Sequence, residues 1–160
     1  MPKGQKKVID CLNESLSAEL TGINQYVVHA EMCGNWGYDR LHDLREKDAI
    51  EEMKHAEALI GRILYLEGVP NVQKLGKINI GETVEEQLKA DLDLEYGAVA
   101  HYNKGVALCA ELNDNGSREL LEKILKDEEK HVDWLEAQRD QIAQVGLQNY
   151  LAQQIVGDKA

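Results

Sequence analysis

The chain has 160 residues, enough for one domain with a full hydrophobic core. Acidic residues outnumber basic ones 29 to 18, and the resulting net charge of −11 argues against nucleic-acid binding and suits cations as partners. Three cysteines without metal-type spacing, a polar N-terminus and the lack of a long apolar run predict a reduced, cytoplasmic protein with no membrane span.

Apolar and small residues recur every three to four positions and predict four long helices. A stretch of 14 residues, 69–82, separates the second helix from the third. Extended chain of that length reaches roughly 45 Å, about the length of a 30-residue helix, so the third helix can start at the opposite end of the bundle. The apolar residues of this crossover are expected to lie on the helices it crosses. The expected helices cover about 5–33, 39–67, 84–112, 118–144 and, as a short fifth helix, 147–156.

Several residues mark the expected helix ends. Gly68 follows the last turn of the second helix, and Pro70 prevents its continuation. Thr83 is the expected N-cap of the third helix, with Glu86 completing a capping box. Ser117 is the expected N-cap of the fourth. The sequence thus predicts an all-α four-helix bundle with one long crossover, as a single domain over 1–160.

Carboxylate and imidazole side chains fall on the core-facing stripe of each long helix. The motif Glu-x-x-His, whose ends share one helix face, occurs on the second and fourth helices. Single glutamates occur on the first and third. One glutamate from each of two helices and a Glu-x-x-His from each of the other two is the ligand pattern of di-iron bundles. The six candidate ligands are Glu19, Glu52, His55, Glu95, Glu128 and His131.

The charge of this set predicts a pair of metal ions. Four buried carboxylates facing two imidazoles cannot neutralise one another, whereas two divalent cations can. Without a thiolate, the set favours iron or manganese. Glu52 and Glu128 are the expected bridges, with Glu19 and Glu95 terminal. Each of these pairs is separated by 76 residues, a hint of duplication. The alternative is that the acids lie solvated on helix flanks.

Two neighbouring residues have two interpretations each. Asp91, one turn before Glu95, is either the acceptor for a histidine N–H or a helix N-terminal acid favoured by the dipole. Tyr26 either hydrogen-bonds a ligand or fills the core.

Several segments closely resemble bacterioferritins, and the resemblance covers essentially the whole chain. It implies a ferritin-like subunit, a shell of 24 copies, a ferroxidase centre with two iron ions on the six residues above, and b-type haem at a two-fold interface. The segments are INQYVVHAEM (23–32), IEEMKHAE (50–57), RILYLEGVPNVQKLGKINIGE (62–82), DEEKHVDWLE (127–136) and GLQNYL (146–151).

The haem ligand implied by the resemblance is Met53, acting together with the same residue of a second subunit. Met53 follows Glu52, so it lies about 100° around the helix and points away from the bundle core. Ile23, Ile50 and Ile60 could form an apolar wall beside it.

The chain also departs from the family pattern. Many members carry a histidine and an aspartate where this chain has Lys47 and Glu51, so an iron site on the inner surface is in question. A tyrosine near the di-iron centre is replaced by Leu59, which leaves an electron-donating step in question. Tyr26 and Trp134 remain.

These observations predict an iron-storage and detoxification protein. It would oxidise Fe(II) with O2 or H2O2 and feed a ferric mineral. Haem would relay electrons from a ferredoxin partner to the mineral for iron release. One alternative is a di-iron peroxidase or oxygenase of the rubrerythrin type, although the Cys-x-x-Cys module usual there is absent. Another is a haem-binding shell without ferroxidase turnover.

Overall fold

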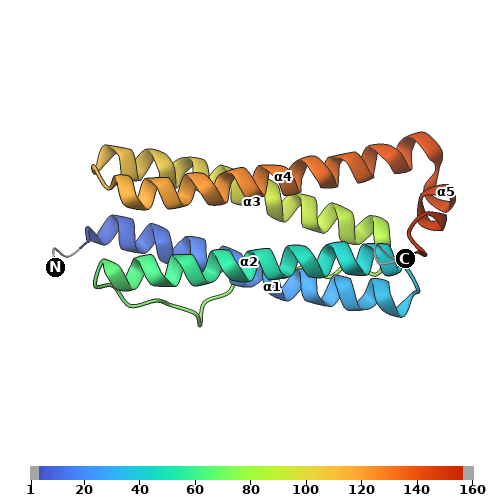
Figure 1. Ribbon diagram of the computed structural model, residues 1–160, viewed down its shortest axis with the longest axis horizontal. Coiled ribbons are helices and arrows are strands. Elements are labelled where there is room, and N and C mark those ends of the chain that lie inside the picture. The colour runs from blue at the N-terminus through green and yellow to red at the C-terminus, as the bar shows by residue number, and fades with distance from the viewer. Residues whose placement is uncertain (1–3, 157–160) are drawn as a thin grey trace.

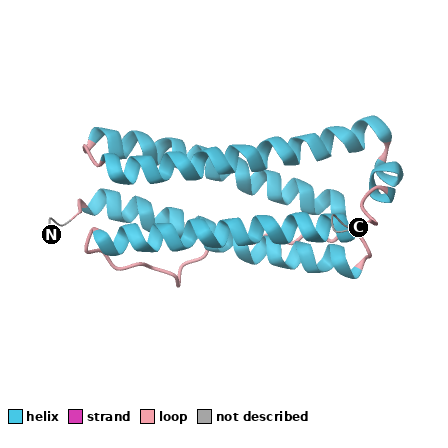
Figure 2. Cartoon of the chain, viewed as in Figure 1, coloured by secondary structure: helices cyan, strands magenta, loops and turns pink. Residues whose placement is uncertain are grey.

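The computed structural model describes residues 4–156, and these residues form five helices with no strand among them (Figures 1 and 2). The all-α class and the bundle predicted from the sequence are therefore confirmed. Within the same residues, no helix combines the length and the hydropathy that crossing a bilayer requires. The helices are α1 (Lys6–Asn35), α2 (Asp39–Tyr65), α3 (Val84–Glu111), α4 (Asn115–Val145) and α5 (Leu147–Ala152).

The long helices pack as two pairs, α1 with α2 and α3 with α4 (Figure 1). The connection between the pairs runs along the bundle, so α3 starts at the end opposite to the one where α2 finishes. The helix α5 lies across that end, where the Gln154 carbonyl accepts the N–H of Arg40 at 3.0 Å. It stops at Ala152 rather than at the expected 156, because the amides of Gln153 and Gln154 bond back only three residues.

The end of α2 differs from the prediction. The helix stops at Tyr65, and the residue in the left-handed region is Glu67, with φ of 64°, rather than Gly68. The N–H of Gly68 still closes the helix by bonding the carbonyl of Ile63 at 2.9 Å. Glycine is required at position 68 for space, since a Cβ there would meet Cγ2 of Ile9 at 2.7 Å.

The predicted N-cap is correct for α3 and wrong for α4. Thr83 caps α3 as predicted, accepting the N–H of Glu86 at 3.2 Å. Ser117 does not cap α4. Asp114 accepts the Ser117 N–H at 3.0 Å, so the helix begins at Asn115 instead of 118. Aspartate is as good an N-cap as serine, and here it also accepts the Ser117 hydroxyl at 2.8 Å.

Polar side chains of α1 hold the crossover between α2 and α3. Thr21 Oγ1 accepts the N–H of Gly76 at 2.8 Å, and Gln25 Oε1 accepts that of Asn79 at 3.1 Å. His29 Nε2 accepts the N–H of Gly81 at 3.0 Å. The complete row follows one face of α1 at four-residue spacing and consists of Asn13, Ser17, Thr21, Gln25 and His29.

The expectation that apolar residues would fix the crossover to the helices is wrong for most of them. Val69 is 81% exposed, and Val72, Leu75 and Ile80 are also exposed in this single chain. The backbone needs hydrogen-bond partners wherever it leaves water, and the polar row on α1 supplies them. The apolar side chains therefore remain available at the surface.

Two apolar clusters enclose the centre of the bundle on either side. One contains Leu12, Leu16, Leu59 and Ile63, and the other contains Leu41, Leu88, Leu92 and Leu135. All three cysteines are buried and free, as expected for reduced core thiols. Between the clusters, the core-facing stripe is polar.

The substitution Thr21→Val should loosen the crossover locally, because the N–H of Gly76 loses its acceptor in a part-buried hydrogen bond. We expect a cost of about 1 kcal/mol, seen as roughly fivefold faster hydrogen exchange at the Gly76 amide. Asn24→Ala is the matched control, since the Asn24 side chain bonds only the Leu20 carbonyl of its own helix. Unchanged exchange at Gly76 in Thr21→Val would contradict this account of the crossover.

Candidate metal centre

Six carboxylate and imidazole side chains from four helices meet at the centre of the bundle. The helices α1 and α3 each supply one glutamate, and α2 and α4 each supply a glutamate and a histidine one turn apart. Every one of these side chains is buried. The structure thus brings together all six residues singled out from the sequence: Glu19, Glu52, His55, Glu95, Glu128 and His131.

The ligand atoms form two overlapping groups of four, each with its atoms within 4.8 Å of one another. Glu52 and Glu128 belong to both groups, whereas each remaining residue belongs to one. A carboxylate shared by both groups can bridge two ions, and the others can each hold one. The first group adds Glu19 and His55, and the second adds Glu95 and His131.

Each imidazole turns the same nitrogen toward the carboxylates. His55 Nδ1 lies 3.3 Å from Glu128 Oε1 and 3.5 Å from Glu19 Oε2. His131 Nδ1 lies 3.3 Å from Glu52 Oε1 and 3.4 Å from Glu128 Oε2. Nδ1 is therefore the nitrogen that each histidine offers to a metal.

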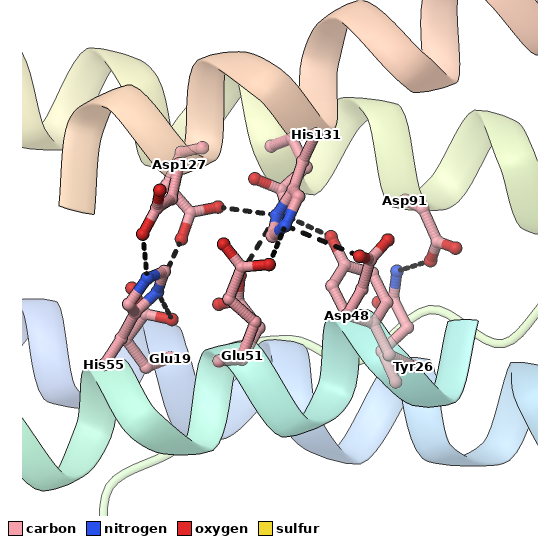
Figure 3. A network of polar contacts seen from close by, with 12 residues as sticks. Glu19, Tyr26, Asp48, Glu51, His55, Asp91, Asp127 and His131 are labelled. Atoms are coloured by element: carbon pink, nitrogen blue, oxygen red, sulfur yellow. Dashed lines mark hydrogen bonds and ion pairs between the residues drawn. The ribbon is translucent and has the colours of Figure 1, made fainter. Parts of the chain in front are cut away.

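The opposite nitrogens contact a second set of acids, as Figure 3 shows. His55 Nε2 lies 2.8 Å from Asp127 on α4. His131 Nε2 lies 3.4 Å from Glu51 and 3.6 Å from Asp48 on α2. An acid that accepts the Nε2 proton fixes the ring orientation and leaves Nδ1 free for a metal ion.

Several polar atoms at the centre have no hydrogen-bond partner although they are fully buried. They include Oε2 of Glu19 and of Glu95, Oε1 of Glu52, and both carboxylate oxygens of Glu128. Burying such groups without compensation is costly. Since these oxygens and both Nδ1 atoms converge, the donor set fits two divalent cations of the iron or manganese type.

The pKa values of these side chains show the same need for positive charge. Burial, followed by the neighbouring Glu19 carboxylate, raises the pKa of Glu52 well above its usual range. Burial opposes protonation of the histidines. The close carboxylates, Glu128 first, outweigh it and raise the pKa of His55 and of His131 to about 11. Protons on the two histidines thus supply positive charge beside the carboxylates.

Two buried tyrosines bond the terminal glutamates. The hydroxyl of Tyr26 on α1 donates to Glu95 on α3, and that of Tyr102 on α3 donates to Glu19 on α1 at 2.5 Å. Burial first, then the nearby carboxylates, raises the pKa of both phenols well above 10, so both stay protonated donors. Tyr26 therefore has the hydrogen-bonding role considered from the sequence.

Sequence reasoning did not assign a site role to Tyr102 or to Asp127. A usable signal was present, because the 76-residue offset that relates Glu52 to Glu128 also relates Tyr26 to Tyr102 and Glu51 to Asp127. The contacts of the two tyrosines with the glutamates, and of the two acids with the histidines, are related by this offset as well.

Asp91 accepts a histidine N–H, but the histidine is not one of the six candidate ligands. Its carboxylate lies 2.9 Å from His29 Nδ1 and accepts from Gln25 at 2.8 Å and from the buried Arg45 at 3.2 Å. The Arg45 guanidinium also stacks on the Trp134 ring, 4.5 Å from its centroid. Asp91 thus links the polar row on α1 to the buried arginine, which the sequence had not indicated.

A cavity of about 320 Å³ connects the centre with the surface between α1 and α3. Small residues, including Ala18, Gly22 and Ala98, line it, and the exposed Asp93 lies at its outer part. At its inner end it reaches the carboxylates of Glu19, Glu52, Glu95 and Glu128. Small solutes therefore have a route to the candidate ligands.

The remaining residues singled out from the sequence lie away from these ligands or serve the core. Met53 is 48% exposed on α2, with the exposed Ile50 one turn before it. Leu59 is fully buried in an apolar cluster. Lys47 is exposed, whereas Glu51 is half-buried against His131.

The fold and site define a class, and comparison with known proteins agrees. Residues 9–145 match the ferritin family, described as a ferritin-like domain. Bacterioferritin of Mycobacterium leprae is 44% identical over 151 residues, covering 94% of this chain and 95% of that protein. Bacterioferritin BfrA of Mycobacterium tuberculosis is 43% identical with the same coverage. Bacterioferritin of Brucella melitensis is 44% identical and covers 92% of each chain.

The protein is thus a ferritin-like four-helix bundle. Within that class, identity above 40% over nearly the whole length shows that the chain belongs to the bacterioferritins, a family of iron-storage proteins.

Proposed function

We propose that this chain is an iron-storage ferroxidase. It binds two Fe(II) ions at the six buried ligands, oxidises them with O2 or H2O2 and delivers the product to a ferric mineral inside a hollow shell of 24 copies. The observation that carries the proposal is the convergence of four buried carboxylates with unpaired oxygens on two imidazole nitrogens. Ferritins form oligomeric shells that bind iron, and the chain's membership of that family supports the storage role.

Each residue of the site has a distinct task in this function. Two Fe(II) ions held side by side supply two electrons to one oxidant. Glu52 and Glu128 serve as the bridging carboxylates, because each belongs to both ligand groups. Asp127 accepts the outer N–H of His55 and holds its Nδ1 toward the metal, whereas Glu51 lies 3.4 Å from Nε2 of His131 and favours the same orientation of that ring by its charge. The cavity between α1 and α3 admits iron and oxidant.

Glu128→Gln tests the proposal, because the amide keeps the shape of the side chain and removes the bridging charge. With two Fe(II) added per chain to the metal-free protein, we expect oxygen uptake to slow by about 10- to 100-fold or more. Glu129→Gln is the matched control, since Glu129 is the next residue and is exposed. Equal rates in the parent and in Glu128→Gln would refute the ferroxidase assignment.

The proposal includes b-type haem shared between two subunits, with Met53 from each as axial ligand. A thioether is an established haem iron ligand. Met53 suits this role because it points out of the bundle and has exposed Ile50 beside it. Of the other proposed wall residues, Ile23 and Ile60 are partly buried against the core.

Met53→Leu should abolish haem binding while keeping an apolar side chain of similar size. The measurement is the haem absorbance per chain in the purified protein. Met32→Leu is the control, because Met32 lies on α1 against Gln87. Full haem content in Met53→Leu would overturn the assignment of this ligand.

Other parts of the proposal rest on narrower support. Buried free cysteines agree with a reducing, cytoplasmic location. The close relatives favour storage over a rubrerythrin-type peroxidase or oxygenase and over a haem-binding shell alone. A ferredoxin is the proposed electron donor for iron release. We treat residues 1–160 as a single ferritin-like domain, and an inner-surface iron site at Lys47 and Glu51 is not part of the proposal.

A further inference from the structure

The cavity between α1 and α3 contains a histidine that the proposed function does not use. His101 on α3 lines this cavity together with two of the candidate ligands, Glu19 and Glu95. It follows Glu95 by six residues, which places it about 9 Å farther along the helix axis. His101 is only partly buried, so water that enters the cavity can reach its ring.

A hydrogen bond to α1 fixes the ring of His101 and assigns its proton. Nε2 lies 2.6 Å from the hydroxyl oxygen of Ser15, a residue with no exposed surface. The Ser15 hydroxyl has a single hydrogen, which it donates to the carbonyl of Cys11 at 2.9 Å. The ring therefore donates its Nε2–H to Ser15, and Nδ1 of the neutral ring carries the free lone pair.

The equivalent bond in the other half of the bundle uses a residue that cannot titrate. The 76-residue offset relates His101 to Gln25 and Ser15 to Asp91, and Gln25 donates to Asp91 at 2.8 Å. The side-chain carbonyl of Gln25 is occupied as well, because it accepts the N–H of Asn79 on the crossover. The half that opens to the cavity thus has an imidazole where the half under the crossover has an amide.

The proposed reaction consumes protons at a buried centre. Reduction of one O2 by two Fe(II) takes up two protons and gives H2O2 and two Fe(III). Reduction of one H2O2 by two Fe(II) also takes up two protons, and it gives two H2O and two Fe(III). With either oxidant, two protons must reach the centre for each pair of ions oxidised.

The surroundings of His101 favour a neutral ring at pH 7. Burial is the main cause that lowers the pKa of His101 below 6.5, with Lys104 on α3 acting in the same direction and Glu14 on α1 opposing both. The ring of Tyr102 packs edge-on against it, with the ring centroids 5.3 Å apart. An imidazolium formed here therefore gives up its proton readily.

The side chains nearest to the ligands are less suited to carry protons. The pKa values of the phenols of Tyr26 and Tyr102 lie well above 10, so these groups do not release protons at neutral pH. Imidazole is the side chain whose ordinary pKa is closest to pH 7, which is the property that proton transfer requires. Among the residues that line the cavity, His101 is the one with this side chain.

We propose that His101 is a proton relay, which takes protons from outer water and passes them through water in the cavity to the oxidant at the centre. The proposal rests on the ferroxidase function above. A polar cavity of this size has room for several water molecules. Nε2 stays bonded to Ser15 while Nδ1 alone gains and loses the proton, so the ring does not have to turn. Ser15 is therefore a positioning residue for the relay.

The test measures oxidation after iron is bound, so the rate does not depend on iron entry. Full-length protein is loaded without oxygen with two Fe(II) per chain, the bound iron is counted, and O2 is added in weak buffer at pH 7. The test variant is His101→Gln, because glutamine already makes the equivalent bond at position 25. His42→Gln is the matched control, since His42 lies on α2 beside Asp43.

We expect His101→Gln to bind two Fe(II) and to oxidise them about 10- to 100-fold more slowly than the parent. Imidazole added to the solution should restore most of the rate, because it can carry protons in place of the missing ring. The rates of the parent and of His42→Gln should not change with imidazole. A parental rate in His101→Gln would overturn the proposal, and so would slow oxidation that imidazole does not restore, since that result indicates a structural role alone.

The tautomer of His101 gives a second test that does not depend on rates. Nitrogen NMR of the protein with isotope-labelled histidine should show the neutral ring protonated on Nε2, with the signal assigned by its loss in His101→Gln. A neutral ring protonated on Nδ1 would overturn the relay. If the parent does not oxidise Fe(II), the ferroxidase function fails and the relay fails with it. Normal oxidation by both the parent and His101→Gln would remove the relay alone.

Discussion

Four carboxylates buried within a few ångströms of one another are the constraint on which this structure depends. Both oxygens of Glu128 lack a hydrogen-bond partner, and the residue belongs to both ligand groups. Burial of its carboxylate therefore requires positive charge on either side. Metal-free protein can supply that charge as protons on His55 and His131, whose pKa values rise to about 11. The apolar clusters on both sides hold the helices in place around these carboxylates.

Much of the surrounding structure serves these carboxylates. Asp127 and Glu51 orient the imidazoles, and Tyr26 and Tyr102 bond the terminal glutamates. The same 76-residue offset relates the members of both pairs, so the site behaves as two copies of one half-site. The polar row on α1 has a different task, because it anchors the crossover that lets α3 run antiparallel to α1.

The sequence predicted the helices and the convergence of the six candidate ligands, because both depend on spacing. Glu52 and His55 must share a face if the segment is helical, whatever its partners are. Spacing does not show which partner the polar end of a side chain contacts. Tyr102 lies about two helical turns after Glu95, yet only the packing of α3 against α1 brings its hydroxyl to Glu19. Asp91 likewise bonds His29, and no sequence pattern indicated that these two residues would pair.

The central claim is that two divalent cations replace protons in this cluster. The most direct measurement is a titration of the metal-free protein with Co(II) at pH 7 in weak buffer, recording bound metal and released protons together. Because the histidine pKa values are near 11, both rings are protonated at pH 7 and must each lose a proton to bind through Nδ1. The account predicts two Co(II) per chain, about two or more protons released, and affinity that increases with pH. Binding of a single ion, or binding without proton release, would contradict it.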